Sequence, residues 1–149
     1  MPKLQIFVPC ERVIIGQENS ASVILIMAEV TFSDLPAQLP DHPASPSKWH
    51  VFSQWLREPG DEGNLFWQEI KMVDGDGKLV ILPHSASFKI SADIHRMNAM
   101  YEVFPIIPPG PYDLVLSLRE DSQGTYSEVG RYTLRVYHRK EDPETQKTD

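Results

Sequence analysis

The chain has 149 residues, of which 41% are hydrophobic and 23% charged, the composition of an ordinary globular protein. This length suits a single hydrophobic core and therefore predicts one domain. The net charge of −7 disfavours nucleic acids and anionic membrane surfaces as partners, because both require a basic face. No apolar stretch reaches the roughly 18 residues of a transmembrane helix. Thirteen prolines against eight glycines is an unusual balance.

The N-terminal residues do not have the pattern of a secretion signal. Gln5, Pro9 and Glu11 interrupt the first apolar stretch, which a signal peptide keeps apolar over about 7–15 residues. Cys10 is the sole cysteine, so no disulfide can form within the chain. Both features favour a cytoplasmic location.

Apolar and polar residues alternate along most of the chain, with the period of half-buried β-strands. From Ile24 to Phe32 the even positions are apolar, while Glu29 and Thr31 face the other way. The clearest strands, 112–118 and 132–136, are joined by the polar residues 120–124 and predict a hairpin. The other predicted strands are 4–8, 13–16, 51–57, 66–72, 79–82 and 88–92.

Four segments lack the pattern of a strand. Residues 34–47 contain Pro36, Pro40, Pro43 and Pro46, so the segment lacks backbone donors and is expected to be an extended loop. Residues 58–64 predict a polar turn, and residues 93–99 predict at most one helical turn. Residues 139–149 carry no apolar side chain and predict a flexible polar tail, which leaves residues 1–138 as the domain.

Short strands separated by turns, without a helical apolar period, predict an all-β fold. The architecture expected is an immunoglobulin-like antiparallel β-sandwich of about seven to nine strands. Gly110, Pro111 and Tyr112 begin the strongest strand. A tyrosine in this place can bury its ring and return its hydroxyl to the backbone across a corner of the sandwich.

Several fragments of the chain, taken in order, resemble a family of small uncharacterised bacterial proteins. The family is thought to form an immunoglobulin-like β-sandwich, and the resemblance covers roughly residues 4–138. It implies a fold but no activity, because the family brings no established catalytic residues. The fragments are 10–14, 22–24, 48–49 with Trp55, 74–78, 104–105, 109–112 and 132–136.

Asp74 and Asp76 alternate with glycines, as in part of a calcium-binding loop. The match fails further along, because the fifth position is Lys78 and the twelfth is Ser85. A tight turn between two strands is the favoured interpretation. Calcium could still bind between loops through acids such as Asp61 and Glu62, although nothing in the sequence brings them together.

No pattern of catalytic or metal-binding residues is present in the sequence. No histidine pair has the spacing of a zinc site, and no Gly-x-Ser-x-Gly or glycine-rich phosphate loop occurs, so neither an enzyme nor a cofactor is expected. Cys10 lies between Pro9 and Glu11 and is expected to pack in the core as a small apolar residue. The five histidines are His42, His50, His84, His95 and His138, and most are expected at the surface. If His50 or His95 faces inward, it could instead be a buried imidazole with its hydrogen bonds satisfied.

The three tryptophans form the candidate interaction surface. Trp49 and Trp55 are six residues apart, so a regular strand places them on one face, and Trp67 begins another strand. Phe52 and Leu56 make the opposite face apolar as well. Such a strand is either central in its sheet, or covered on one face by the proline segment or by a partner.

These features together predict a non-catalytic β-sandwich interaction module with an unknown protein partner. A sandwich that binds carbohydrate or calcium is one alternative, and a self-assembling structural subunit, such as a homodimer, is another. Neither nucleic acid nor membrane is expected as a partner.

Overall fold

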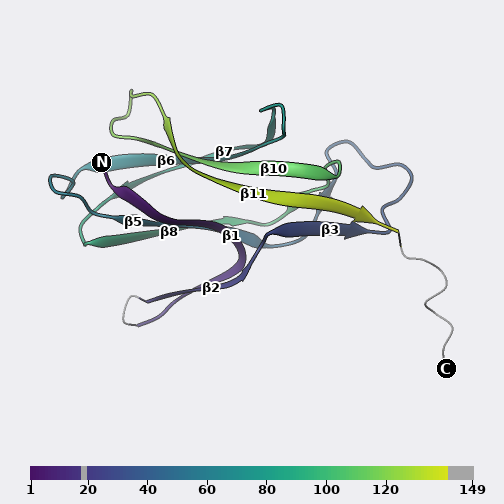
Figure 1. Ribbon diagram of the computed structural model, residues 1–149, viewed down its shortest axis with the longest axis horizontal. Helices are drawn as coiled ribbons and strands as arrows, with labels where there is room; N and C mark the ends of the chain where they lie inside the picture. The colour runs from purple at the N-terminus through teal and green to yellow at the C-terminus, as the bar shows by residue number, and fades with distance from the viewer. Residues whose placement is uncertain (18–19, 141–149) are drawn as a thin grey trace.

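The structure, a computed structural model, describes residues 1–17 and 20–140. Two β-sheets lie face to face, and a small two-stranded sheet accompanies them (Figure 1). The described residues form eleven strands and no helix, which confirms the predicted all-β class and is consistent with a sandwich. No helix among the described residues is long and apolar enough to cross a membrane.

Each sheet is assembled from strands that are distant in sequence. The first sheet has the order β2 (Ala21–Ile26), β1 (Lys3–Ile15), β5 (Trp49–Leu56) and β8 (Ile94–Tyr101). The second has the order β3 (Glu29–Ser33), β11 (Ser127–Arg139), β10 (Gly110–Arg119), β6 (Leu65–Val73) and β7 (Leu79–Lys89). The small sheet pairs β4 (Ala44–Ser45) with β9 (Phe104–Pro105). Among the strand pairs of the described residues, only β3 and β11 run parallel.

Alternate side chains of both sheets meet in one core. Strand β5 lies between β1 and β8, and residues on both of its faces are buried, as its apolar composition predicted. Each large apolar side chain that is fully buried contributes about 1.5–3 kcal/mol to stability. The largest of these side chains are Trp49, Trp55, Phe52, Phe66, Phe104, Ile70, Met72, Ile90, Leu114, Leu116, Leu118 and Leu134.

One polar side chain in the core joins the two sheets. Gln68 of β6 is 2% exposed, and its Oε1 accepts hydrogen bonds from two donors of β5 in the opposite sheet. The hydroxyl of Ser53 donates at 3.0 Å and the indole Nε1 of Trp55 at 3.3 Å. Because all three groups are buried, the loss of the acceptor would leave two donors without water or protein partners.

The predicted tyrosine corner is confirmed. The Tyr112 hydroxyl donates a 2.8 Å hydrogen bond to the carbonyl oxygen of Pro108, four residues back along the chain. The ring is 6% exposed and packs in the core. Gly110, between them, has a φ of 149°, a conformation that favours glycine.

The two lateral sides of the sandwich differ. On one side β1 packs against β11, and a Cβ atom at Gly130 would lie 2.5 Å from Cδ2 of Leu4. Only glycine permits this approach without displacing the leucine. On the other side the edge strands β8 and β7 face each other, with the ring of His95 stacked on Phe88 at 4.8 Å. The small β4–β9 sheet continues from the end of β8 on that side.

The predicted single strand from Ile24 to Phe32 was wrong. Strand β2 ends at Ile26 in the first sheet, and β3 begins at Glu29 in the second. Met27 and Ala28 therefore carry the chain between the sheets. The alternation of apolar residues continues through this crossover, so the pattern could not show that the chain changes partners.

Other predicted boundaries also change. The helical turn expected at 93–99 is wrong, because Ile94–Tyr101 forms β8 and pairs with β5 along its length. Pairing with β5 satisfies the backbone hydrogen-bonding groups of β8, although apolar and polar residues do not alternate regularly in its sequence. The two predicted strands 4–8 and 13–16 belong to one strand, β1. The predicted strand 79–82 and the start of the predicted strand 88–92 both lie in β7. Most of the predicted tail, residues 141–149, lies outside the described residues.

We expect Gln68→Met to lower the free energy of unfolding by about 1–3 kcal/mol, because Ser53 and Trp55 lose their acceptor while the side chain keeps its length. Urea denaturation followed by tryptophan fluorescence measures the change. Adding Ser53→Ala removes one orphaned donor and should restore part of the loss. Gln5→Met, at an exposed position of β1, is the control; equal effects of both glutamine variants would contradict the role of Gln68.

Tyr112→Phe should lower the free energy of unfolding by about 1 kcal/mol, because it deletes the hydroxyl that bonds to Pro108 and retains the ring. Tyr137→Phe, at a position 38% exposed on β11, is the matched control. A denaturation midpoint of the Tyr112 variant equal to that of the parent would remove the energetic role of the corner.

Candidate interaction site

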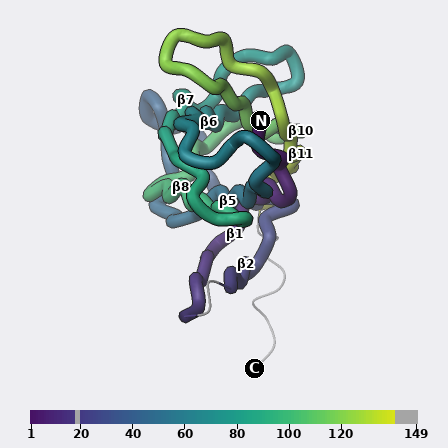
Figure 2. The backbone as a smooth tube through the Cα atoms, turned by 90° about the vertical axis from the view of Figure 1, so that its left-hand side faces the viewer, coloured from purple at the N-terminus to yellow at the C-terminus, as the bar shows by residue number. Residues whose placement is uncertain are grey.

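A two-stranded ribbon extends beyond the sandwich. Strand β1 pairs with β5 from Lys3 to Cys10, and from Cys10 to Ile15 it pairs with β2 instead. We call residues 11–17 and 20–26 the ribbon. Figure 2 shows it projecting away from both layers of the sandwich.

Large apolar side chains are exposed along the ribbon. Partners across the two strands share a face, so Ile14 lies on the face of Ile24, and Val13 lies on the opposite face with Val23. Both faces are therefore apolar, and neither is covered by another described strand. The exposed fractions are 48% for Ile14, 53% for Ile15, 37% for Ile24, 63% for Leu25 and 55% for Ile26.

The composition of β2 is that of a strand buried on both faces. Ala-Ser-Val-Ile-Leu-Ile contains no charge, glycine or proline, yet four of its six residues are exposed. Leu25 also has a φ of 54°, in the left-handed region, which costs a leucine about 1 kcal/mol. A strained leucine with most of its surface in water does not stabilise the monomer, and such features are found at contact sites.

The other sheet edges carry features that discourage pairing with a further strand. Strand β7 contains Pro83 and Lys89 and has two register irregularities against β6. Strand β8 carries His95 and Arg96, and β3 begins with Glu29. Charges, prolines and bulges are the usual means by which edge strands avoid association. Strand β2 has neither charge nor proline, so it is the edge most open to a partner.

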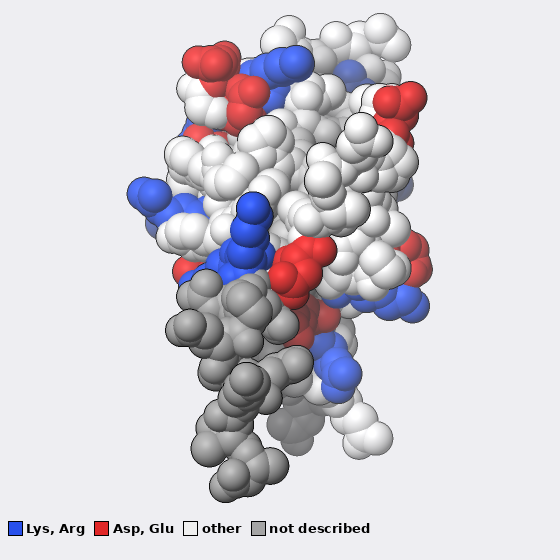
Figure 3. All heavy atoms as spheres, turned by 90° about the vertical axis from the view of Figure 1, so that its right-hand side faces the viewer, with Lys and Arg blue, Asp and Glu red and all other residues white. Residues whose placement is uncertain are grey.

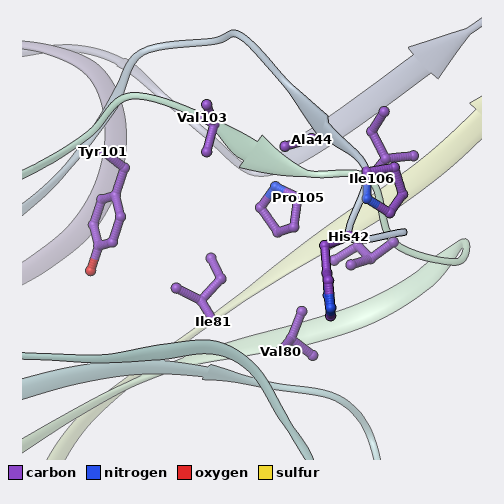
Figure 4. A pocket seen from close by; sticks show the side chains of 10 residues that line it. His42, Ala44, Val80, Ile81, Tyr101, Val103, Pro105 and Ile106 are labelled. Carbon is purple, nitrogen blue, oxygen red and sulfur yellow. The ribbon is translucent and has the colours of Figure 1, made fainter. Parts of the chain in front are cut away.

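A second candidate site is an apolar cleft of about 430 Å³ beside the small β4–β9 sheet. Val80 and Ile81 of β7 form one wall, and Figure 4 shows them opposite Pro105 and Val103. The cleft therefore lies on the β7–β8 side of the sandwich. Its other lining residues are His42, Pro43, Ala44, Tyr101, Ile106 and Ile107.

Tyr101 gives the cleft one polar group. Its ring stacks on Trp49 with 4.4 Å between centroids, and burial raises the pKa of its phenol to about 12. The hydroxyl therefore stays protonated at neutral pH, and it forms no hydrogen bond with any residue that the structure describes. It remains available as a donor in a cleft that is apolar apart from the imidazole of His42.

The tryptophans predicted as an interaction surface occupy two different environments. Trp49 and Trp55 are 1% and 0% exposed, so their rings belong to the core and cannot face a partner in this fold. Trp49 donates its indole hydrogen to the carbonyl oxygen of Val103 at 2.9 Å. Trp67 is half-buried, and the guanidinium of Arg119 lies 5.5 Å from its ring centroid. The three rings thus form no common surface.

Cys10 is fully buried, and burial raises the pKa of its thiol, opposed by a hydrogen bond with the backbone of Arg12. A raised pKa disfavours the thiolate that a nucleophile requires. His95 is stacked on Phe88, and burial lowers the pKa of its imidazole. His138 contacts the carbonyl oxygen of Ile107 at 2.8 Å, and His50 contacts Asn98 at 3.0 Å.

The Asp74–Lys78 segment is a turn, as expected. Oδ1 of Asp74 accepts hydrogen bonds from the backbone N–H groups of Asp76 and Lys78, and Gly77 has a φ of 78°. Asp61 likewise accepts a bond from the backbone of Glu58. Within residues 1–17 and 20–140, no group of three or more His, Cys, Asp or Glu residues could hold a metal ion.

Several charged residues at the surface form ion pairs with one another. Arg131 contacts Asp113 at 2.6 Å and Glu128 at 2.9 Å, and Arg57 contacts Asp93 at 2.6 Å. The hydrogen bond from Thr133, with the contacts to Arg131, lowers the pKa of the Asp113 carboxyl despite its partial burial. Both signs of charge are interspersed on the face shown in Figure 3. These groups form local ion pairs and not a field of one sign.

The sequence predicts neither of the two sites. The signal for the ribbon is the unbroken apolar run at 23–28, which is typical of a strand buried on both faces. Only the structure shows that it is exposed. The cleft has no comparable signal, because its walls come from three separate segments, 42–44, 80–81 and 101–107.

Comparison with known proteins assigns no family to the chain. No protein-family model and no curated protein matches the chain. Among solved structures, the N-terminal domain of PorA is similar with a TM-score of 0.36 and 12% sequence identity. The alignment covers 89% of this chain and 97% of that domain.

Proposed function

We propose that this protein is a non-catalytic interaction module that binds a protein chain through the ribbon. The observation that carries the proposal is a pair of strands, projecting from the sandwich, in which five large apolar side chains are 37–63% exposed. An exposed apolar patch of this kind marks an interaction site. The free edge of β2 adds unpaired backbone donors and acceptors, which an extended protein segment can satisfy.

The chemistry of the ribbon favours protein over the other partner classes. A nucleic acid would need a basic stripe, whereas the chain has a net charge of −7 and β2 carries no charge. Catalysis is not part of the proposal, because the thiol of Cys10 is buried and its raised pKa disfavours the thiolate. The resemblance to small bacterial sandwich proteins and the single buried cysteine support, as further parts of the proposal, a bacterial source and a cytoplasmic location.

Affinity purification of the tagged chain from its native host tests the ribbon. We expect Leu25→Asn to lose the captured protein, because it replaces the most exposed leucine of the ribbon by a polar residue that tolerates a left-handed φ. Leu82→Asn, at a position 80% exposed on β7, is the matched control and should capture the same protein as the parent. Identical captured proteins for the parent and Leu25→Asn would overturn the proposal.

The cleft supports a second candidate function, the binding of a small apolar ligand. Its size lies within the range of small-molecule sites, and the phenol of Tyr101 would donate to one acceptor atom on the ligand. A carbohydrate fits this cleft less well, because eight of its ten lining residues have apolar side chains. No cluster of metal-ligating residues in the described ranges supports a calcium site.

Saturation-transfer NMR with a set of small aromatic esters and ketones tests the cleft. We expect binding to be lost with Val103→Arg, because Val103 lines the cleft and is 49% exposed, so the longer side chain obstructs the opening. Met100→Arg places the same charge at an exposed position of β8 that does not line the cleft, and should leave binding unchanged. An absence of binding by the parent chain would set this candidate aside.

A further inference from the structure

We propose that the protein segment bound by the ribbon is the ribbon of a second copy of this chain, with the two β2 edges paired antiparallel about a two-fold axis. This inference rests on the proposed function and names its partner. The first sheet would then continue from one copy into the other, in the order β8-β5-β1-β2 followed by the same strands reversed.

The exposed apolar area of the ribbon is available to such an interface. The five large apolar residues of the ribbon present on the order of 500 Å² per copy. Pairing of the two β2 edges places Ile24 of one copy beside β2 residues of the other on the same sheet face, so association removes part of this area from water. An interface of less than about 1,200 Å² is typical of weak, reversible association.

The lack of charge on β2 favours a second copy of the chain as the partner of the ribbon. Strand β2 is uncharged, so pairing with itself places no like charges opposite each other. A partner that recognised the ribbon through ion pairs would find only Glu11 and Arg12 among its described residues, 11–17 and 20–26. Each copy has a net charge of −7, but the ribbon projects from the sandwich and holds the two bodies apart (Figure 2). Repulsion between exposed charges is largely screened beyond about 8 Å at physiological salt.

The arrangement closes at two copies. A two-fold interface uses the same surface on both chains, so the paired β2 edges are no longer available to a third chain. The left-handed φ of Leu25 interrupts the regular backbone near the end of β2, which limits ladder pairing to residues 21–24. The Leu25 side chain, 63% exposed, then packs on the partner ribbon beyond the paired segment.

Sedimentation equilibrium of the purified full chain, from about 1 to 100 μM, tests the proposal. We expect a reversible dimer. Leu25→Asn and Ile24→Lys should each weaken it on the order of 100-fold, because the affected side chain is lost twice in a two-fold interface. Leu82→Asn should leave the dissociation constant unchanged.

Two further measurements separate association from folding. Leu25→Asn relieves a strained backbone position, so its monomer should unfold at a denaturant concentration no lower than that of the parent. The backbone amides of residues 21–24 that point away from β1 should exchange with solvent more slowly at about 100 μM than at about 1 μM, because they gain a hydrogen-bond partner only in the dimer.

The outcomes distinguish the two proposals. If the parent chain remains monomeric at 100 μM, the proposal that the partner is a second copy is overturned. A dimer that is weakened by Leu82→Asn but not by the ribbon variants would overturn it as well. Association into open polymers overturns the two-fold arrangement. If the chain is monomeric but still captures a different protein that Leu25→Asn loses, the interaction module stands and only its partner changes.

Discussion

Two hydrogen bonds that meet on the buried side chain of Gln68 fix how the two sheets lie on each other. Their donors, Ser53 and Trp55, are two residues apart on β5 and share one face, so both reach the same acceptor from the opposite sheet. Sliding the sheets by one residue pair would break both bonds inside the core, where unpaired polar groups are costly. Many immunoglobulin-like sandwiches join their sheets with a disulfide; this chain has a single cysteine and uses a polar contact instead.

The relative position of the sheets decides where binding surfaces can form. With β5 opposite β6, strand β1 lies on β11, where Gly130 lets the two strands approach and closes that side. Strand β8 then lies against β7, and the edge strands there leave space for the small β4–β9 sheet and the cleft beside it. The cleft is thus a consequence of sheet alignment. The ribbon has another cause: β1 is longer than its partner β5, and the excess pairs only with β2.

The sequence predicts the sandwich because alternation, turn residues and the tyrosine corner are local signals. Residues 112–118 alternate cleanly and lie within β10, and Tyr112 makes the expected bond to Pro108. The predictions that were wrong concern strands whose pairing depends on residues distant in sequence. Strands β2 and β3 share one apolar pattern but belong to different sheets, and β8 is a strand because β5 pairs with it. Gln68 was visible as the polar residue on the apolar face of Phe66 and Ile70, but its role required the opposite strand.

The ribbon is held by the sandwich but adds little to its core. Its large apolar side chains lie outside the hydrophobic core, so their loss removes little from the stability of the monomer. A two-stranded hairpin alone is marginally stable in water, and this one is held because β1 continues into the sandwich. Apolar residues that neither fill the core nor protect a sheet edge are a hazard for a single chain. They become favourable once another protein segment covers them, and an uncharged strand is well suited to pairing with its own copy.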